Sequence, residues 1–322
     1  MNHNEQKGQG VEPPARQQPT CCGDQGSRVR QSTETSDVRQ AVREHYGKAA
    51  AQHEATRTGS CCGGSRSSHV QDIYETPDAF DLPEEISGFS LGCGDPITLA
   101  ALQPGNTVLD LGSGGGLDCF LAARRVGESG HVIGVDMTAE MIEKARQNNL
   151  RMGFSNVEFR LGEIEHIPVG DNSVDVIISN CVINLSPDKP QVLREAYRVL
   201  KPGGRLAVSD IVTDGPLPRE LQDSLRAWAG CVAGALDMRE FHRLLETAGF
   251  VDIKITPQYW DGTAMAEMVE QMVSAETGQT SGCCAPPTGW GTGGALLEKA
   301  GFTSKELSKR IFSARISAAK PG

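Results

Sequence analysis

The segment from Thr107 to Gly116, TVLDLGSGGG, decides the fold class of the chain. Its first half is a short apolar run typical of a buried strand, and apolar residues at helical spacing follow from Leu117 to Val126. Glycines between a strand and a helix let the backbone turn tightly and approach a ligand closely. The spacing is G-x-G-x-G instead of the G-x-G-x-x-G of dinucleotide sites, so we expect a ligand without a pyrophosphate.

Strand and helix patterns alternate beyond this segment. We predict strands at His131–Val135, Val157–Arg160, Val174–Ser179 and Arg205–Ile211, and helices at Thr138–Met152 and Gln191–Leu200. This alternation predicts an α/β fold, a parallel sheet with helices on both faces. Later in the chain we predict helices at Leu217–Ala229 and Met238–Ala248, and strands at Val251–Thr256 and Arg310–Ala318.

An acidic residue follows the second predicted strand. Asp136 lies about 20 residues beyond Gly116, the position at which nucleotide-binding folds place a carboxylate against a ribose diol. A tight turn in an ordinary α/β protein is the alternative to a nucleoside site. Strand placement, glycines and acidic spacing together favour the nucleoside site.

Composition excludes several classes of protein. The net charge is −10, from 31 basic and 41 acidic residues, which argues against a protein that grips nucleic acid. No apolar run approaches the roughly 18 residues of a membrane span, and no apolar signal segment follows the polar N-terminus. We therefore expect a cytoplasmic protein with neither nucleic acid nor membrane as a partner.

Four regions are expected along the chain. Residues 1–36 are polar and predict a disordered tail. Residues 37–94 are expected to hold a short helix, with Val38, Val42 and Tyr46 on one face, and a cysteine-bearing loop. Residues 95–256 form the nucleoside-binding domain, and residues 257–322 a small extension with a mobile loop and a final strand.

The chain has 10 cysteines, and they do not resemble a disulfide framework. Adjacent cysteines bridge each other only with strain, so the pairs predict buried residues, metal or metalloid ligands, or redox thiols. Cys119 lies on a predicted packing helix and is expected in the core, whereas Cys93, Cys181 and Cys231 lie on predicted loops. Cys181 follows the fourth strand and should therefore face the nucleoside site. The adjacent pairs are Cys21-Cys22, Cys61-Cys62 and Cys283-Cys284.

The nucleoside motifs resemble those of class I S-adenosylmethionine-dependent methyltransferases. The stretches that carry the resemblance are Val108–Gly116, Gly134–Met137, Gly162–Pro168 and Leu200–Gly204. The resemblance implies that Asp136 holds the ribose of S-adenosylmethionine, that Glu163 and Ile164 flank the adenine, and that Asp110 and Gly112 line the methionine end. Ser113, Gly114, Gly116, Met137 and Asn180 complete the expected cofactor set.

The loop cysteines resemble those of bacterial arsenite methyltransferases. The similar stretches are Leu91–Pro96, Ser179–Lys189 and Ala229–Ala235, with the Cys61-Cys62 pair upstream. The resemblance implies that Cys181, Cys231 and Cys93 bind trivalent arsenic, presented as arsenite or a thiol conjugate. It also implies that Cys61 or Cys62 joins a disulfide relay cleared by thioredoxin or glutathione, for arsenic detoxification.

Two other functions remain open from the sequence. The same fold could methylate another small acceptor, such as a quinone precursor, with the thiols dispensable. The chain could also be a non-catalytic thiol protein that binds a metalloid or zinc, although the cysteine pairs lack the C-x₂-C spacing of zinc sites. The pairs Cys21-Cys22 and Cys283-Cys284 could capture arsenic or be incidental.

Overall fold

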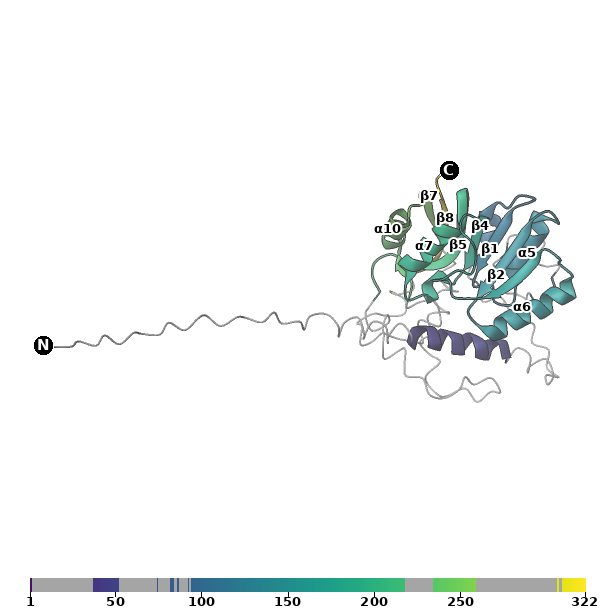
Figure 1. Ribbon diagram of the computed structural model, residues 1–322, viewed down its shortest axis with the longest axis horizontal. Coiled ribbons are helices and arrows are strands. Elements are labelled where there is room, and N and C mark those ends of the chain that lie inside the picture. Colours follow the sequence, from purple (N-terminus) through teal and green to yellow (C-terminus); the bar gives the residue numbers. More distant parts are fainter. Residues whose placement is uncertain are drawn as a thin grey trace.

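The computed structural model describes residues 37–51, 94–217, 234–258 and 309–322, with Met1, Tyr74, Leu82, Pro83, Ile86, Gly92 and Glu306. Apart from Met1 and Leu217, the predicted N-terminal tail, the predicted helix at 217–229 and the loop around Cys283-Cys284 lie outside these residues. The described elements form one eight-stranded sheet with helices packed on it (Figure 1).

The strand order in the sheet is β3-β2-β1-β4-β5-β8-β7, with β6 paired to β5. The first five strands along the sheet run parallel, and β8 runs antiparallel to both β5 and β7. The strands are β1 (Thr107–Leu111), β2 (His131–Asp136), β3 (Val157–Leu161), β4 (Val174–Asn180), β5 (Leu200–Thr213), β6 (Leu236–Asp237), β7 (Val251–Gln258) and β8 (Ile311–Ala319). The predicted Rossmann-like α/β fold is confirmed.

Helices cover both faces because strand residues alternate between two cores. On β1, Val108 packs in the core under α4, α5 and α6, whereas Leu109 and Leu111 pack in the core under α7 and α10. The helices are α4 (Pro96–Ala100), α5 (Leu117–Val126), α6 (Ala139–Met152), α7 (Lys189–Val199) and α10 (Met238–Ala248), with a 3₁₀ turn η2 (Ile183–Leu185).

One predicted turn belongs instead to a strand. The resemblance implies a turn at Leu200–Gly204 before the predicted strand at Arg205–Ile211, but β5 begins at Leu200 and the pairing register with β4 shifts between Val174 and Val176. The cause is distant in sequence: Gly203 N donates to Lys320 O at 3.1 Å, and Lys320 N donates to Gly204 O at 2.8 Å. Backbone hydrogen bonds between β5 and the C-terminal segment therefore continue through the two glycines, which keeps them in the strand.

The final strand completes the sheet. Sequence reasoning placed it in an extension beyond residue 256, but β8 lies between β5 and β7 and pairs with β5 from Arg205–Ala319 to Thr213–Ile311. Ile316, at the centre of β8, is fully buried. The strand is thus part of the same hydrophobic core as the nucleoside motifs.

A helix over residues 37–51, drawn in purple in Figure 1, lies outside the sheet. Val38, Val42 and Ala50 are buried on its inner face, and Tyr46 is half-buried, as the apolar spacing predicts. Arg43 forms an ion pair with Glu163 at 3.2 Å, beyond the end of β3. In the part of the chain that is described, no helix is long and apolar enough to cross a membrane.

Candidate cofactor cleft and its cysteine

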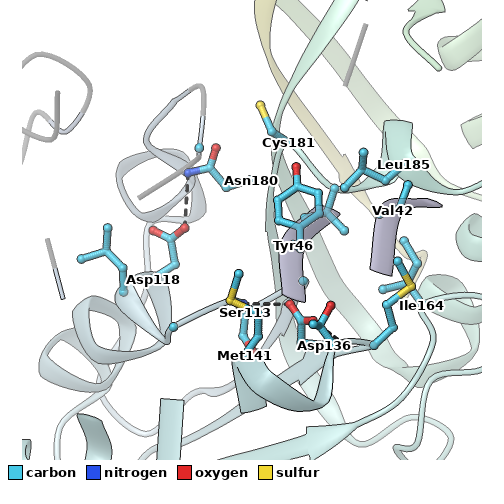
Figure 2. A pocket seen from close by; sticks show the side chains of 18 of the residues that line it. Val42, Tyr46, Ser113, Asp118, Asp136, Met141, Ile164, Asn180, Cys181 and Leu185 are labelled. Carbon is cyan, nitrogen blue, oxygen red and sulfur yellow. Dashed lines mark hydrogen bonds between the residues drawn. The ribbon is translucent and has the colours of Figure 1, made fainter. Parts of the chain in front are cut away.

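A cleft lies where β1, β2 and β4 end, beneath the helix over residues 37–51 (Figure 2). It holds about 1080 Å³ of empty space, including open solvent at its mouth. Its walls are the glycine loop after β1, the residues after β2, β3 and β4, and the inner face of the helix, with Arg39, Val42 and Tyr46. Parallel α/β sheets bind ligands at this edge.

The glycine loop follows a path that side chains would block. Gly112 has φ +72°, and a Cβ there would lie 2.3 Å from the side chain of Val182. A Cβ on Gly114 would meet no described atom within 4 Å, so the backbone at Gly114 faces the open cleft. Ser113 also lines the cleft, and its buried hydroxyl has no hydrogen-bond partner among the described residues. A ligand can therefore approach this backbone closely.

Asp136 is fixed at the cleft by two backbone amides. Gly114 N donates to its Oδ2 at 3.0 Å and Thr138 N donates to its Oδ1 at 2.8 Å. Burial raises the pKa of this carboxyl, although both hydrogen bonds oppose the shift. An ionised carboxylate has about four lone-pair sites on its two oxygens, so Asp136 retains acceptor capacity for a diol.

A second buried carboxylate, which the sequence reasoning missed, lines the same cleft. Asp118 accepts hydrogen bonds from the Tyr74 hydroxyl at 2.9 Å and from Asn180 Nδ2 at 3.3 Å. Burial raises its pKa to about 7, against the effect of both hydrogen bonds. The only sequence signal was the place of Asp118 in the first turn of α5, directly after the glycines.

The predicted cofactor residues divide into two groups. Gly112, Ser113, Gly114, Asp136, Met137, Ile164 and Asn180 line the cleft. Three do not: Gly116 sits behind the loop against Phe120, Glu163 turns toward Arg43, and Asp110 is buried beneath the loop. Asp110 accepts a hydrogen bond from Cys119 Sγ at 3.2 Å, and burial raises the pKa of both side chains.

The two described cysteines differ in environment. Cys119 is fully buried and free, as expected for a core residue. Cys181 lines the cleft directly after β4, in a left-handed conformation with φ +56°, and its N–H donates to Ser209 O at 2.8 Å. Figure 2 shows the Cys181 sulfur at the edge of the cleft, directed away from Asp136.

Cys181 is disulfide-bonded, whereas Cys119 is free. Cys61, Cys62, Cys93 and Cys231 all lie outside the described residues, so the predicted arsenic site is described only at Cys181. Within the described ranges, no three His, Cys, Asp or Glu side chains are grouped to hold a metal ion.

Known proteins are similar to this chain in sequence and in fold. A family model described as "Methyltransferase domain" matches residues 102–249. The structure of an arsenic(III) S-adenosylmethionine methyltransferase from Chlamydomonas reinhardtii is 33% identical, with a TM-score of 0.57, over 80% of this chain and 75% of that one. The chain belongs to the arsenite S-adenosylmethionine methyltransferase family.

Two curated arsenite methyltransferases extend the likeness. The protein of Halobacterium salinarum is 44% identical over 74% of this chain, and that of Aquipseudomonas alcaligenes is 42% identical over 68%. The matched regions span 65% and 63% of these relatives, respectively, so the chain covers less than two thirds of their length.

The family's cofactor, S-adenosylmethionine, fits the residues present. The open backbone at Gly114 and the Asp136 carboxylate, which two backbone amides hold in place, provide polar contacts for a nucleoside. Asp118 in the wall holds a proton near neutral pH that a ligand with a sulfonium and an ammonium group can displace, which suits this cofactor.

Proposed function

We propose that this chain methylates trivalent arsenic with S-adenosylmethionine. Family membership and a cleft suited to the cofactor support the reaction class. The single observation that carries the proposal for this chain is that Cys181 lines the same cleft as Asp136 and the glycine loop. A soft thiolate ligand and a nucleoside site thus share one cavity.

Each end of the cleft has its own role. Asp136 would hold the ribose, Ile164 would pack against the adenine, and Ser113 with Gly114 would hold the methionine end. Bound S-adenosylmethionine would supply a methyl group on a positively charged sulfur. The sulfur would keep the electron pair of the broken bond and become a neutral thioether. The protein's part is to orient the acceptor and to exclude water, which can supply most of the rate acceleration.

At the thiol end, Cys181 would bind arsenic together with Cys93 and Cys231. Three thiolates leave the arsenic lone pair free to accept the methyl group. Trivalent arsenic carries no proton on that lone pair, so no side chain has to act as a general base. Each protein thiol does have to lose its own proton to bind arsenic.

Re-reduction of arsenic calls for a thiol pair. Methylation raises arsenic formally from the trivalent to the pentavalent state. Two thiolates return two electrons and become a disulfide, which thioredoxin or glutathione would reduce. The disulfide state of Cys181 supports this part of the proposal, and Cys61 or Cys62 would be the upstream member of the relay. We place the reaction in the cytoplasm, where it would detoxify arsenic.

Measurement of methyl transfer tests the proposal, with one variant at the thiol end of the cleft and one at the cofactor end. The purified chain is incubated with arsenite, S-adenosylmethionine and a thiol, and both S-adenosylhomocysteine and methylated arsenic are measured. Cys181→Ser should abolish methylation but leave cofactor binding by calorimetry intact. Asp136→Ala should weaken cofactor binding by about 1.5–3 kcal/mol, the usual worth of a hydrogen bond to a charged group.

Cys119→Ala is the matched cysteine control, because Cys119 is free and buried outside the cleft lining. We expect it to methylate arsenic. No methylated arsenic from the unmodified chain would overturn the proposal. Cofactor turnover on a quinone precursor, undiminished in Cys181→Ser, would indicate the alternative methyltransferase, and retained zinc without turnover would indicate a metal-binding protein.

A further inference from the structure

One buried carboxylate joins the helix over the cleft to the loop that carries Cys181. Glu165 follows β3 and is 4% exposed. Its Oε1 accepts three hydrogen bonds, from Arg39 Nε and Nη2, each at 3.2 Å, and from the Ser186 hydroxyl at 2.7 Å. Arg39 and Glu165 are 126 residues apart in sequence.

The helix side of this junction belongs to the cleft. Arg39 lines the cleft on the same helical face as Val42 and Tyr46. Figure 2 shows Val42 and Tyr46 near Asp136 and Ile164. A nucleoside bound at Asp136 would therefore contact the helix that presents Arg39 to Glu165.

The loop side of the junction belongs to the thiol end. Ser186 is 3% exposed and closes the turn after Cys181: its N–H donates to Ile183 O at 3.1 Å, and its Oγ accepts from Asp188 N at 3.1 Å. The far side of the same loop is attached to β5, because Cys181 N donates to Ser209 O at 2.8 Å and Asn184 Nδ2 donates to Asp210 Oδ1 at 2.8 Å. Ser186 is thus the point where this loop meets Glu165.

The two sides depend on each other for an electrostatic reason. A buried carboxylate is stable only while charged or polar donors surround it. If the helix withdraws Arg39, the Ser186 hydroxyl is the one donor that Glu165 Oε1 keeps among the described residues, and the carboxylate turns toward water. That turn removes the acceptor of Ser186 and loosens the loop. Conversely, a loop held by Ser186 keeps Glu165 in place for Arg39.

We propose that Glu165 is a positioning residue that couples cofactor binding to the placement of Cys181. Filling the cleft favours the docked helix, the docked helix fixes Glu165 through Arg39, and Glu165 fixes the Cys181 loop through Ser186. The cofactor would then bind first and order the thiol end. The inference rests on the proposed function only for the role of Cys181 as an arsenic ligand; the coupling itself needs no arsenic.

The test measures protection of the Cys181 thiol by S-adenosylhomocysteine. The full chain is reduced with a phosphine, alkylated with and without saturating S-adenosylhomocysteine, and Cys181 modification is followed by peptide mass spectrometry. We expect the ligand to slow alkylation of Cys181 by about tenfold or more, within the usual range of coupling between sites. In Glu165→Gln and Ser186→Ala, also at saturation, we expect about twofold protection or less.

Three comparisons keep the result specific. Arg43→Gln removes another ion pair from the same helix, the one with Glu163, and should retain wild-type protection. Ser186→Thr keeps the hydroxyl and should therefore retain most of the protection of Cys181 that Ser186→Ala loses. Cys119 is the internal reference, because its buried thiol reacts only if the whole domain opens.

Wild-type protection in both Glu165→Gln and Ser186→Ala would overturn the inference, because the ligand would then shield Cys181 directly. Equal loss in Arg43→Gln would also overturn it. If Glu165→Gln does not fold, Ser186→Ala and Ser186→Thr decide the question. Failure of arsenite methylation in the unmodified chain is a separate measurement, so it cannot be mistaken for failure of the coupling.

Discussion

Single residues in the cleft wall hold ionisable groups in unusual states. Asp118 is 8% exposed, and its partners are two neutral donors, Tyr74 and Asn180. Neutral donors stabilise a carboxylate less than a cation would, so desolvation dominates and the pKa rises to about 7. The cleft therefore carries a proton near neutral pH that a cationic ligand can displace.

This raised pKa predicts how stability depends on pH. Well below pH 3.8, Asp118 is protonated in both the folded and the unfolded chain, so its burial does not lower the free energy of unfolding. As the pH rises to 7, the unfolded chain ionises the group, whose ordinary pKa is 3.8, while the folded chain keeps the proton. The contribution of Asp118 to the free energy of unfolding should fall across this window by up to about 4 kcal/mol.

Asp118→Asn removes this titration, so its free energy of unfolding should change less between pH 4 and pH 7 than that of the unmodified chain. Urea unfolding of the ligand-free chain, followed by circular dichroism at several pH values, measures both slopes. Equal slopes would show that Asp118 titrates normally.

At the scale of elements, most bounds followed from local pattern. The apolar runs at Thr107–Leu111 and Leu117–Val126 gave β1 and α5 with the bounds predicted, because glycines mark the junction between them. Helix α7 begins at Lys189, earlier than expected, since Asp188 caps it by accepting from Gln191 N at 3.1 Å.

The site was predictable only where one strand end carries the residue. Asp136 and Cys181 line the cleft as their places at the ends of two strands predict, because parallel strands end at one edge, and Asn180 was expected from the family resemblance. The contact of Arg39 with Glu165 could not be predicted, since it joins residues 126 apart across a surface that only the folded chain creates. The hydrogen bond from Tyr74 to Asp118 could not be predicted for the same reason, because it joins residues 44 apart in sequence.

The helix over residues 37–51 is an element held by a small apolar face, so its docking can be weakened alone. Val42 is 1% exposed on that face, and Val42→Ala should cost about 1–2 kcal/mol of docking energy through lost burial. Amide exchange within the helix should accelerate by roughly tenfold, with β1 and β4 amides unchanged.

Lys48→Ala replaces an exposed side chain on the same helix and is the control. Its amide exchange rates in the helix should stay within about a factor of two of those of the unmodified chain. Faster exchange in β1 as well as in the helix would mean that the helix and the sheet open as one unit. In that case the helix could not close over the cofactor independently.

The whole molecule depends on its last strand. β8 bridges β5 and β7, and Lys320 Nζ donates to Leu200 O at 2.8 Å, so the C-terminal segment also holds the start of β5. The parallel strands that carry the cofactor motifs therefore share a core with a strand more than 50 residues beyond β7. Such non-local pairing forms late in folding because a long loop has to close first.

Ile316→Ala tests this dependence on the C-terminal strand. Ile316 is fully buried in the core that also contains Leu109 and Val208, so its truncation should cost about 2–5 kcal/mol of global stability. Because the core is shared, urea unfolding by circular dichroism and loss of cofactor binding should shift to the same lower midpoint.

Ser317→Ala is the control, because Ser317 is half-buried at the next position of β8, and it should shift the midpoint little. Two separate transitions in Ile316→Ala, with cofactor binding retained through the first, would show that β8 and β7 form a unit apart from the cofactor half of the sheet.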